Sequence, residues 1–118
     1  MSTLNVSNIT DGTDTVGTSY VVNGSAKAWV RYNHTSNTVV SSLNVSSVVD
    51  NGVGLHTVNF SSSFTGDDAS GTGSNDAFQC ISEIEVTTSS YYRWYTRRND
   101  GGVLDSPVSN SQYMGDLA

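Results

Sequence analysis

The segment Tyr91–Arg98, YYRWYTRR, has the most unusual side-chain chemistry in the chain. It carries three of the four arginines, three tyrosines and one of the two tryptophans. Aromatic rings and guanidinium groups are favoured at binding interfaces, and together they suit a carbohydrate or another protein. We therefore predict a ligand-binding or partner-binding strip that consists of Tyr91, Tyr92, Arg93, Trp94, Tyr95 and Arg97.

The same segment also fits an ordinary β-strand. Side chains alternate between the two faces of a strand, so each face carries every second residue. One face would carry Tyr91, Arg93, Tyr95 and Arg97, and the other would carry Tyr92, Trp94, Thr96 and Arg98. In this alternative the aromatic rings fill a core, and arginines pair across a hairpin with Glu83 and Glu85. Both interpretations can hold at once, one on each face.

Trp29 lies between Lys27 and Arg31 at alternating positions, which makes a second candidate binding face. An indole ring stacks on a sugar, and the two cations would orient acidic groups of a ligand. The alternative, which is the more common case, is that this face packs against a neighbouring sheet or subunit under the stems of Lys27 and Arg31.

The sequence predicts no metal, no cofactor and no catalytic centre. His34 and His56 lie far apart and have no partner at a ligand spacing. The aspartates of segment 66–76 fit no known calcium loop. No G-x-S-x-G motif is present, and Cys80 is the only cysteine. We therefore expect a protein that is not an enzyme.

The elements that position these residues are short strands. Runs rich in Val, Thr, Tyr and Phe are separated by clusters of Asn, Asp, Gly and Ser, whereas no sustained apolar stripe of helical period occurs. The strongest hairpin signal is the turn at 50–52, Asp-Asn-Gly, between two β-branched runs. The expected strands cover 3–9, 19–22, 25–32, 38–40, 43–49, 55–60, 77–87, 91–98 and a final stretch around 108–114, with a loop at 66–76.

About eight short strands in 118 residues predict an all-β fold, a small antiparallel and jelly-roll-like β-sandwich. We expect residues 1–18 to form an N-terminal strand or attachment arm and residues 19–118 to form the sandwich. Ser, Thr, Asn and Gly account for 55 of the 118 residues, so the core is thin. Association of several copies is a usual remedy for a thin core.

Net charge excludes several classes of partner. The chain has a formal charge of −6 with only five Lys and Arg, so it lacks the basic face that binding to a nucleic acid or an anionic membrane surface requires. No apolar run is long enough to span a membrane, and the first residues have neither the basic nor the apolar region of a signal peptide.

Two segments resemble a module of bacteriophage tail fibres, especially those of marine and cyanobacterial phages. Residues 26–30 read AKAWV, and residues 43–60 contain NVSS, DNG and TVNF in the order that is typical of that module. The opening residues 2–9 and the Gly-Asp pair at 115–116 are also similar. The similarity covers about the first half of the chain, and the segment between 64 and 98 departs from it.

The resemblance implies a homotrimeric virion protein, made in the host cytoplasm. Its expected function is that of a short tail-fibre or fibre-tip protein that binds a host-surface glycan without catalysis. Leu4, Val6 and Ile9 would then attach the arm to another virion protein by adding a strand to a sheet edge. The alternative is a trimeric capsid decoration protein that stabilises the phage head. A glycan depolymerase is a third and weaker hypothesis.

Overall fold

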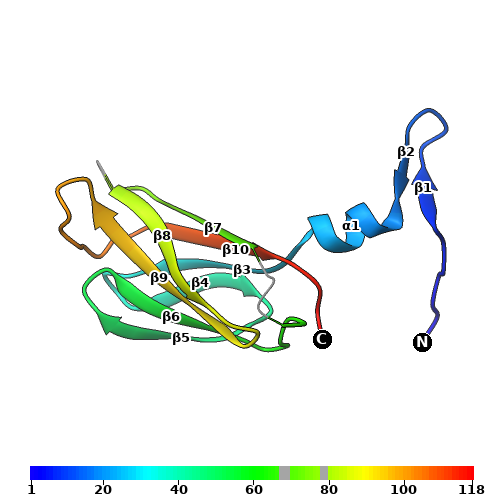
Figure 1. The fold of residues 1–118 in the computed structure, drawn as a ribbon. Helices are drawn as coiled ribbons and strands as arrows, with labels where there is room; N and C mark the ends of the chain where they lie inside the picture. Colours follow the sequence, from blue (N-terminus) through cyan, green and yellow to red (C-terminus); the bar gives the residue numbers. More distant parts are fainter. Residues whose placement is uncertain (67–69, 78–79) are drawn as a thin grey trace.

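A computed structural model describes residues 1–66, 70–77 and 80–118, with the backbone alone for residues 23 and 85–87. Two antiparallel sheets of four strands each pack face to face, and a short N-terminal arm projects from one end (Figure 1). The predicted all-β sandwich is therefore confirmed as a fold class.

The first sheet has the strand order β4-β3-β10-β7, and the second has the order β5-β6-β9-β8. In the first sheet these strands are β4 (Thr38–Leu43), β3 (Ala26–Asn33), β10 (Ser109–Met114) and β7 (Ser70–Asn75). In the second they are β5 (Val45–Gly52), β6 (Leu55–Phe60), β9 (Tyr91–Arg98) and β8 (Cys80–Thr87). The hairpins β3–β4, β5–β6 and β8–β9 each stay within one sheet. In the first sheet β10 lies between β3 and β7, and in the second β9 lies between β6 and β8.

The predicted hairpin between β5 and β6 is confirmed, but its turn lies later than expected. Strand β5 continues through Asn51 and Gly52, and the turn falls at Val53 and Gly54. The glycines have φ angles of 132° at Gly52 and 66° at Gly54, a region that side chains with a Cβ rarely adopt. The Asp50 carboxylate accepts a hydrogen bond of 2.9 Å from the Gly52 N–H, which holds the end of the strand.

Aromatic rings dominate the core between the sheets. Among the residues whose side chains are described, nine apolar ones are buried and six of these are aromatic; the nine are Ala28, Val30, Tyr32, Val58, Phe60, Phe64, Tyr92, Trp94 and Tyr113. Tyr92 from one sheet stacks on Tyr113 from the other, with ring centroids 3.9 Å apart. A few large rings thus fill a space for which this sequence supplies few leucines and isoleucines.

The predicted loop at 66–76 is wrong in part, because Ser70–Asn75 forms strand β7 and pairs with β10. The reason is steric. A Cβ placed on Gly71 would lie 2.3 Å from the Tyr113 ring, so only glycine leaves room for that ring beneath the sheet. Glycines that indicate a loop by composition are here a packing requirement. Asp67 and Asp68 lie outside the described residues. Strand β8 begins at Cys80 rather than at 77, and Phe78 of that prediction is likewise outside them.

The N-terminal arm differs from expectation in two places. The predicted strand at 3–9 is reduced to β1 (Asn8–Thr10), which pairs with β2 (Thr15–Gly17). The predicted strand at 19–22 is wrong, because α1 (Thr18–Gly24) is a short helix. This segment has no neighbouring strand, so its backbone groups are satisfied locally by a helical turn instead of by a sheet.

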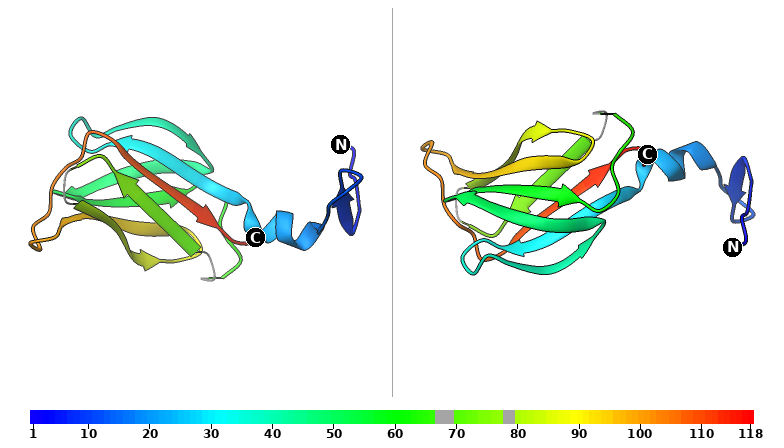
Figure 2. Two further views of the ribbon diagram at one scale, coloured as in Figure 1. Left: turned by 90° about the horizontal axis from the view of Figure 1, so that it is seen from above. Right: turned by 90° about the horizontal axis from the view of Figure 1, so that it is seen from below.

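Figure 2 shows the arm projecting from the sandwich at the end where the C-terminus also lies. The first strand of the two sheets begins at Ala26, directly after α1. Among the described residues, no helix is long and apolar enough to cross a membrane.

Candidate functional site

The outer face of the first sheet carries the predicted Trp29 face. Ala28, Val30 and Tyr32 point into the core, so the alternate residues of β3 point away from it. The Trp29 side chain is 37% exposed, whereas Trp94, the other tryptophan, is completely buried. Part of Trp29 is therefore open to solvent on the outer face of the first sheet.

The register of the sheet aligns two rows of side chains across all four strands. One row is Leu43, Trp29, Gln112 and Thr72, and the other is Ser41, Arg31, Asn110 and Ser74. These eight residues are all exposed. The rows lie side by side because each pair is two residues apart on its own strand, which is the spacing of side chains on one face.

All residues of these rows except Leu43 line a groove on the outer face; we call it the Trp29 groove. The lining includes Trp29 and Arg31 together with hydroxyl and amide side chains from β4, β7 and β10. None of the described residues that line it is acidic. An apolar ring beside a guanidinium group and several neutral hydrogen-bonding groups is suited to a polyhydroxylated ligand such as a glycan.

Lys27, the second cation predicted for this face, is turned toward the arm. Its ammonium group donates hydrogen bonds to the Val22 carbonyl, to the Ser25 hydroxyl and, at 3.2 Å, to the Ser25 carbonyl. The contacts place Lys27 at the junction between α1 and β3. Arg31 is therefore the cation of the groove.

The predicted strip on β9 is divided between two environments. Tyr92 and Trp94 are buried in the core together with Thr96, as the alternative interpretation expected for one face. Arg93 is exposed on the outer face of the second sheet, and Tyr91, Tyr95 and Arg97 are half-buried there. The strip is therefore not one continuous surface.

The Arg97 guanidinium is engaged within the sheet. Its Nε lies 2.7 Å from a carboxylate oxygen of Glu83 on β8, and its charged carbon lies 4.3 Å from the Tyr95 ring centroid. The predicted pairing of an arginine with Glu83 is thus confirmed, while the Glu85 side chain lies outside what the structure describes. A cation that is already paired offers less to an anionic ligand than Arg31 does.

The predicted attachment residues Leu4, Val6 and Ile9 are all exposed, and Leu4 reaches 84% exposure. Only Ile9 belongs to a strand, β1. The arm thus presents apolar side chains that the sandwich does not cover.

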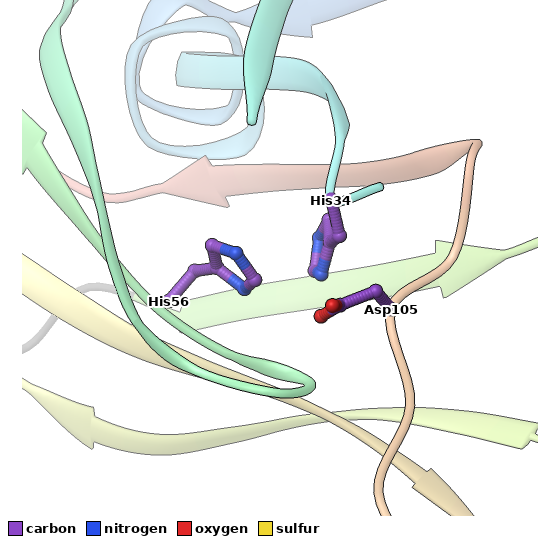
Figure 3. Close-up of side chains that lie close together, drawn as sticks. All are labelled: His34, His56 and Asp105. Atoms are coloured by element: carbon purple, nitrogen blue, oxygen red, sulfur yellow. The ribbon is translucent and has the colours of Figure 1, made fainter. Parts of the chain in front are cut away.

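A cluster that the sequence did not predict lies inside the sandwich. His34, His56 and Asp105 come together from three separate segments (Figure 3). One ring nitrogen of each histidine and one carboxylate oxygen of Asp105 lie within 4.8 Å of one another, and all three atoms are of types that can bind a metal. The histidine rings have centroids 3.9 Å apart, and the side chains are 1% and 0% exposed. We call these three residues the His-Asp cluster.

Burial lowers the pKa of both histidines of the cluster. Burial, followed by the neighbouring His56, lowers the pKa of His34 to about 4. Burial also lowers the pKa of His56, although Asp50 and Asp105 oppose this shift. All four ring nitrogens lack a hydrogen-bond partner among the described residues. This is unusual, because buried polar groups in folded proteins are normally hydrogen-bonded and leaving them unpaired lowers stability.

One signal in the sequence identifies this cluster in retrospect. His34 continues the inward alternation of Ala28, Val30 and Tyr32, and His56 has the same phase as Val58 and Phe60. A histidine in the phase of a buried face is expected to lie inside the protein. Their proximity to Asp105 depends on how the two sheets pack, and no sequence spacing encodes it.

Comparison of the chain with protein-family models, with curated proteins and with solved structures gave no match.

Proposed function

We propose that the chain is a non-enzymatic virion protein of a tailed bacteriophage, of the fibre-tip type, which binds a host-surface glycan through the Trp29 groove. The observation that carries the glycan-binding part is the pair of aligned rows across four strands. A rigid sheet holds their side chains in fixed relative positions, which is the condition for recognising a small polar ligand.

The resemblance to phage tail fibres supports a bacteriophage as the source of the protein. The segments that carry the resemblance lie in regular elements of the fold. The segment 26–30 lies in β3 and supplies Trp29 itself, and the segment 43–60 contains the β5–β6 hairpin. The resemblance therefore covers the strand that provides the aromatic ring of the groove.

The exposed arm supports attachment to a partner virion protein. Leu4, Val6 and Ile9 have apolar side chains open to solvent, and the β1–β2 pair has unpaired edges where a strand can be added. A homotrimer would place three grooves on one particle component. Three weak sites on a common base increase the overall affinity without a strong single site.

Glycan binding can be tested with the purified chain on an array of neutral and acidic bacterial glycans, followed by titration of the best ligand. We expect Trp29→Ala to weaken binding at least about tenfold, because a central aromatic contact typically contributes 2 kcal/mol or more. Tyr95→Ala is the matched control, since it removes an outward aromatic residue from the opposite sheet. Equal loss in both variants, or no glycan bound by the native chain, would contradict the proposed groove.

The exposed apolar arm equally favours the second candidate, a capsid decoration protein, because the same arm can clamp a shell protein. The copy number in purified virions separates the two functions. Fibre proteins occur in small multiples of the tail symmetry, whereas decoration proteins occur in hundreds. Quantitative gel densitometry of the particle measures this directly.

A further inference from the structure

Three potential metal ligands converge at the end of the sandwich that lies away from the arm. There β3 ends, β6 begins and the loop joining β9 to β10 passes over them (Figures 1 and 3). We propose that His34, His56 and Asp105 bind one first-row transition-metal dication, and that Zn²⁺ is the ion that this ligand set favours. The site goes beyond the proposed glycan binding and does not depend on it.

The ligand chemistry supports this assignment. Two imidazole nitrogens and one carboxylate oxygen are donors that Zn²⁺ accepts in a tetrahedral site with a fourth position left for water. Hard cations such as Mg²⁺ and Ca²⁺ prefer oxygen ligands alone, so they fit these residues poorly.

The buried ring nitrogens provide the second argument. Nδ1 and Nε2 of both histidines have no hydrogen-bond partner among the described residues, although both side chains are almost completely buried. Each unpaired polar atom in an interior is costly. A neutral imidazole has one N–H group and one nitrogen with a free lone pair, so the two rings together offer two lone pairs. One dication accepts both of them.

Hydrogen bonds to backbone groups hold two of the three ligands in place. The Asp105 carboxylate accepts a hydrogen bond of 2.8 Å from the Gly54 N–H, and the His34 N–H donates one of 3.0 Å to the Ser106 carbonyl. A Cβ on Gly54 would lie 2.8 Å from the Thr96 carbonyl oxygen, so glycine is needed for the β5–β6 turn to approach this closely. The site therefore joins both sheets and the loop between β9 and β10.

Asp50 is placed to support His56 from outside the site. One of its carboxylate oxygens lies 3.7 Å from His56 Nε2, and the carboxylate is fixed by the Gly52 N–H at 2.9 Å and by the Asn37 amide at 2.8 Å. At this distance the Asp50 carboxylate places a negative charge beside the His56 ring without a direct hydrogen bond, and a negative charge there favours a bound cation.

The alternative is that two neutral histidines simply fill the interior, with ordered water satisfying their nitrogens. The two cases differ in whether the protein binds metal at low concentration. Isothermal titration of the full, tag-free chain with ZnCl₂ after treatment with a chelator measures this. We expect one Zn²⁺ per chain with micromolar or tighter affinity, and a visible absorption spectrum of tetrahedral Co²⁺ when CoCl₂ is used instead.

The variants identify the ligands. Asp105→Asn keeps the size of a partly exposed side chain but removes its charge, so it should fold normally and bind Zn²⁺ at least about tenfold more weakly, the minimum expected from losing even an outer partner. His56→Gln should abolish the Co²⁺ spectrum. Asp116→Asn, at an exposed carboxylate near the C-terminus, is the matched control and should bind as the native chain does.

Circular dichroism of each variant separates loss of a ligand from loss of the fold. Two results would overturn the metal site. One is that the folded native chain binds no Zn²⁺ at submillimolar concentration. The other is that Asp105→Asn and His56→Gln both bind Zn²⁺ with the native affinity, because the ion would then lie elsewhere.

Discussion

Strands β3 and β9 each contain one tryptophan, yet Trp29 faces solvent and Trp94 faces the core. In β3, Arg31 lies two residues from Trp29 on the same face, whereas in β9 the positions two residues from Trp94 are Tyr92 and Thr96. In β3 the Trp29 face is open to solvent, whereas in β9 the Trp94 face closes the core. The same residue type thus serves a candidate ligand groove in one sheet and the interior in the other.

The difference arises from what lies on the alternate residues. The other face of β3 carries small and medium apolar side chains and Tyr32, which pack against the second sheet. The other face of β9 carries Arg93 and Arg97, whose charges cannot be buried without partners. Each strand therefore buries the face whose burial costs least, even where this leaves an indole ring exposed.

The largest effect is expected when each tryptophan is replaced in turn. Trp94→Ala should lower the free energy of unfolding by about 3–5 kcal/mol, because it leaves a cavity at the centre of the core. Trp29→Ala should change it by less than about 1 kcal/mol, since the ring is exposed. Urea denaturation followed by circular dichroism measures both. Similar losses for the two variants would mean that Trp29 is covered in solution, as it would be at a subunit interface.

A second test concerns the inward and outward residues of β7. Gly71→Ala should destabilise the fold by about 1–3 kcal/mol, because its methyl group would overlap the Tyr113 ring that Tyr92 holds from the other side. Thr72→Ala, one position further and pointing outward, should stay within about 0.5 kcal/mol of the native chain. Thermal unfolding of both variants measures this difference in stability. If Gly71→Ala left the stability unchanged, the Tyr113 ring would be able to move aside.

A third test compares two tyrosine hydroxyls of β9. Tyr92 shares a hydrogen bond with the Ser111 hydroxyl across the core, so Tyr92→Phe should cost about 1 kcal/mol and leave a buried polar atom without its partner. Tyr95→Phe, on the outer face, should cost less than about 0.5 kcal/mol. Denaturation midpoints with an unchanged m-value provide the measurement. If Tyr95→Phe lowered the stability more than Tyr92→Phe, the assignment of inner and outer faces in β9 would be in error.

The smallest effect is expected at the ion pair between Arg97 and Glu83. Both side chains are partly exposed, and a surface pair of this kind typically contributes about 0.2–1 kcal/mol. A double-mutant cycle of Arg97→Ala and Glu83→Ala measures the coupling. It should decrease at high salt, because salt screens exposed charges. A coupling that does not respond to salt would indicate that the Tyr95 contact, rather than the charge, orients Arg97.

Local patterns predicted much of the fold. The alternation of side chains placed strands close to β3, β6 and β9, and the Asn-Gly signal placed the hairpin between β5 and β6. Patterns failed where a tertiary contact decides the conformation. Gly71 indicates a loop by composition, but the Tyr113 ring packs against it in the sheet. Residues 19–22 indicate a strand by composition, but no strand pairs with them in the described part of the chain, and they form a helix.

The candidate sites divide in the same way. The sequence by itself determined that Trp29 shares a face with Arg31, and that Tyr92 shares one with Trp94, because the period of two is a property of the single strand. Only the tertiary structure decided which of these faces lies inside, because burial is a competition between the two faces of every strand in both sheets. It alone also brought His34, His56 and Asp105 within reach of one ion, since residues so distant along the chain meet only when the sheets close on each other.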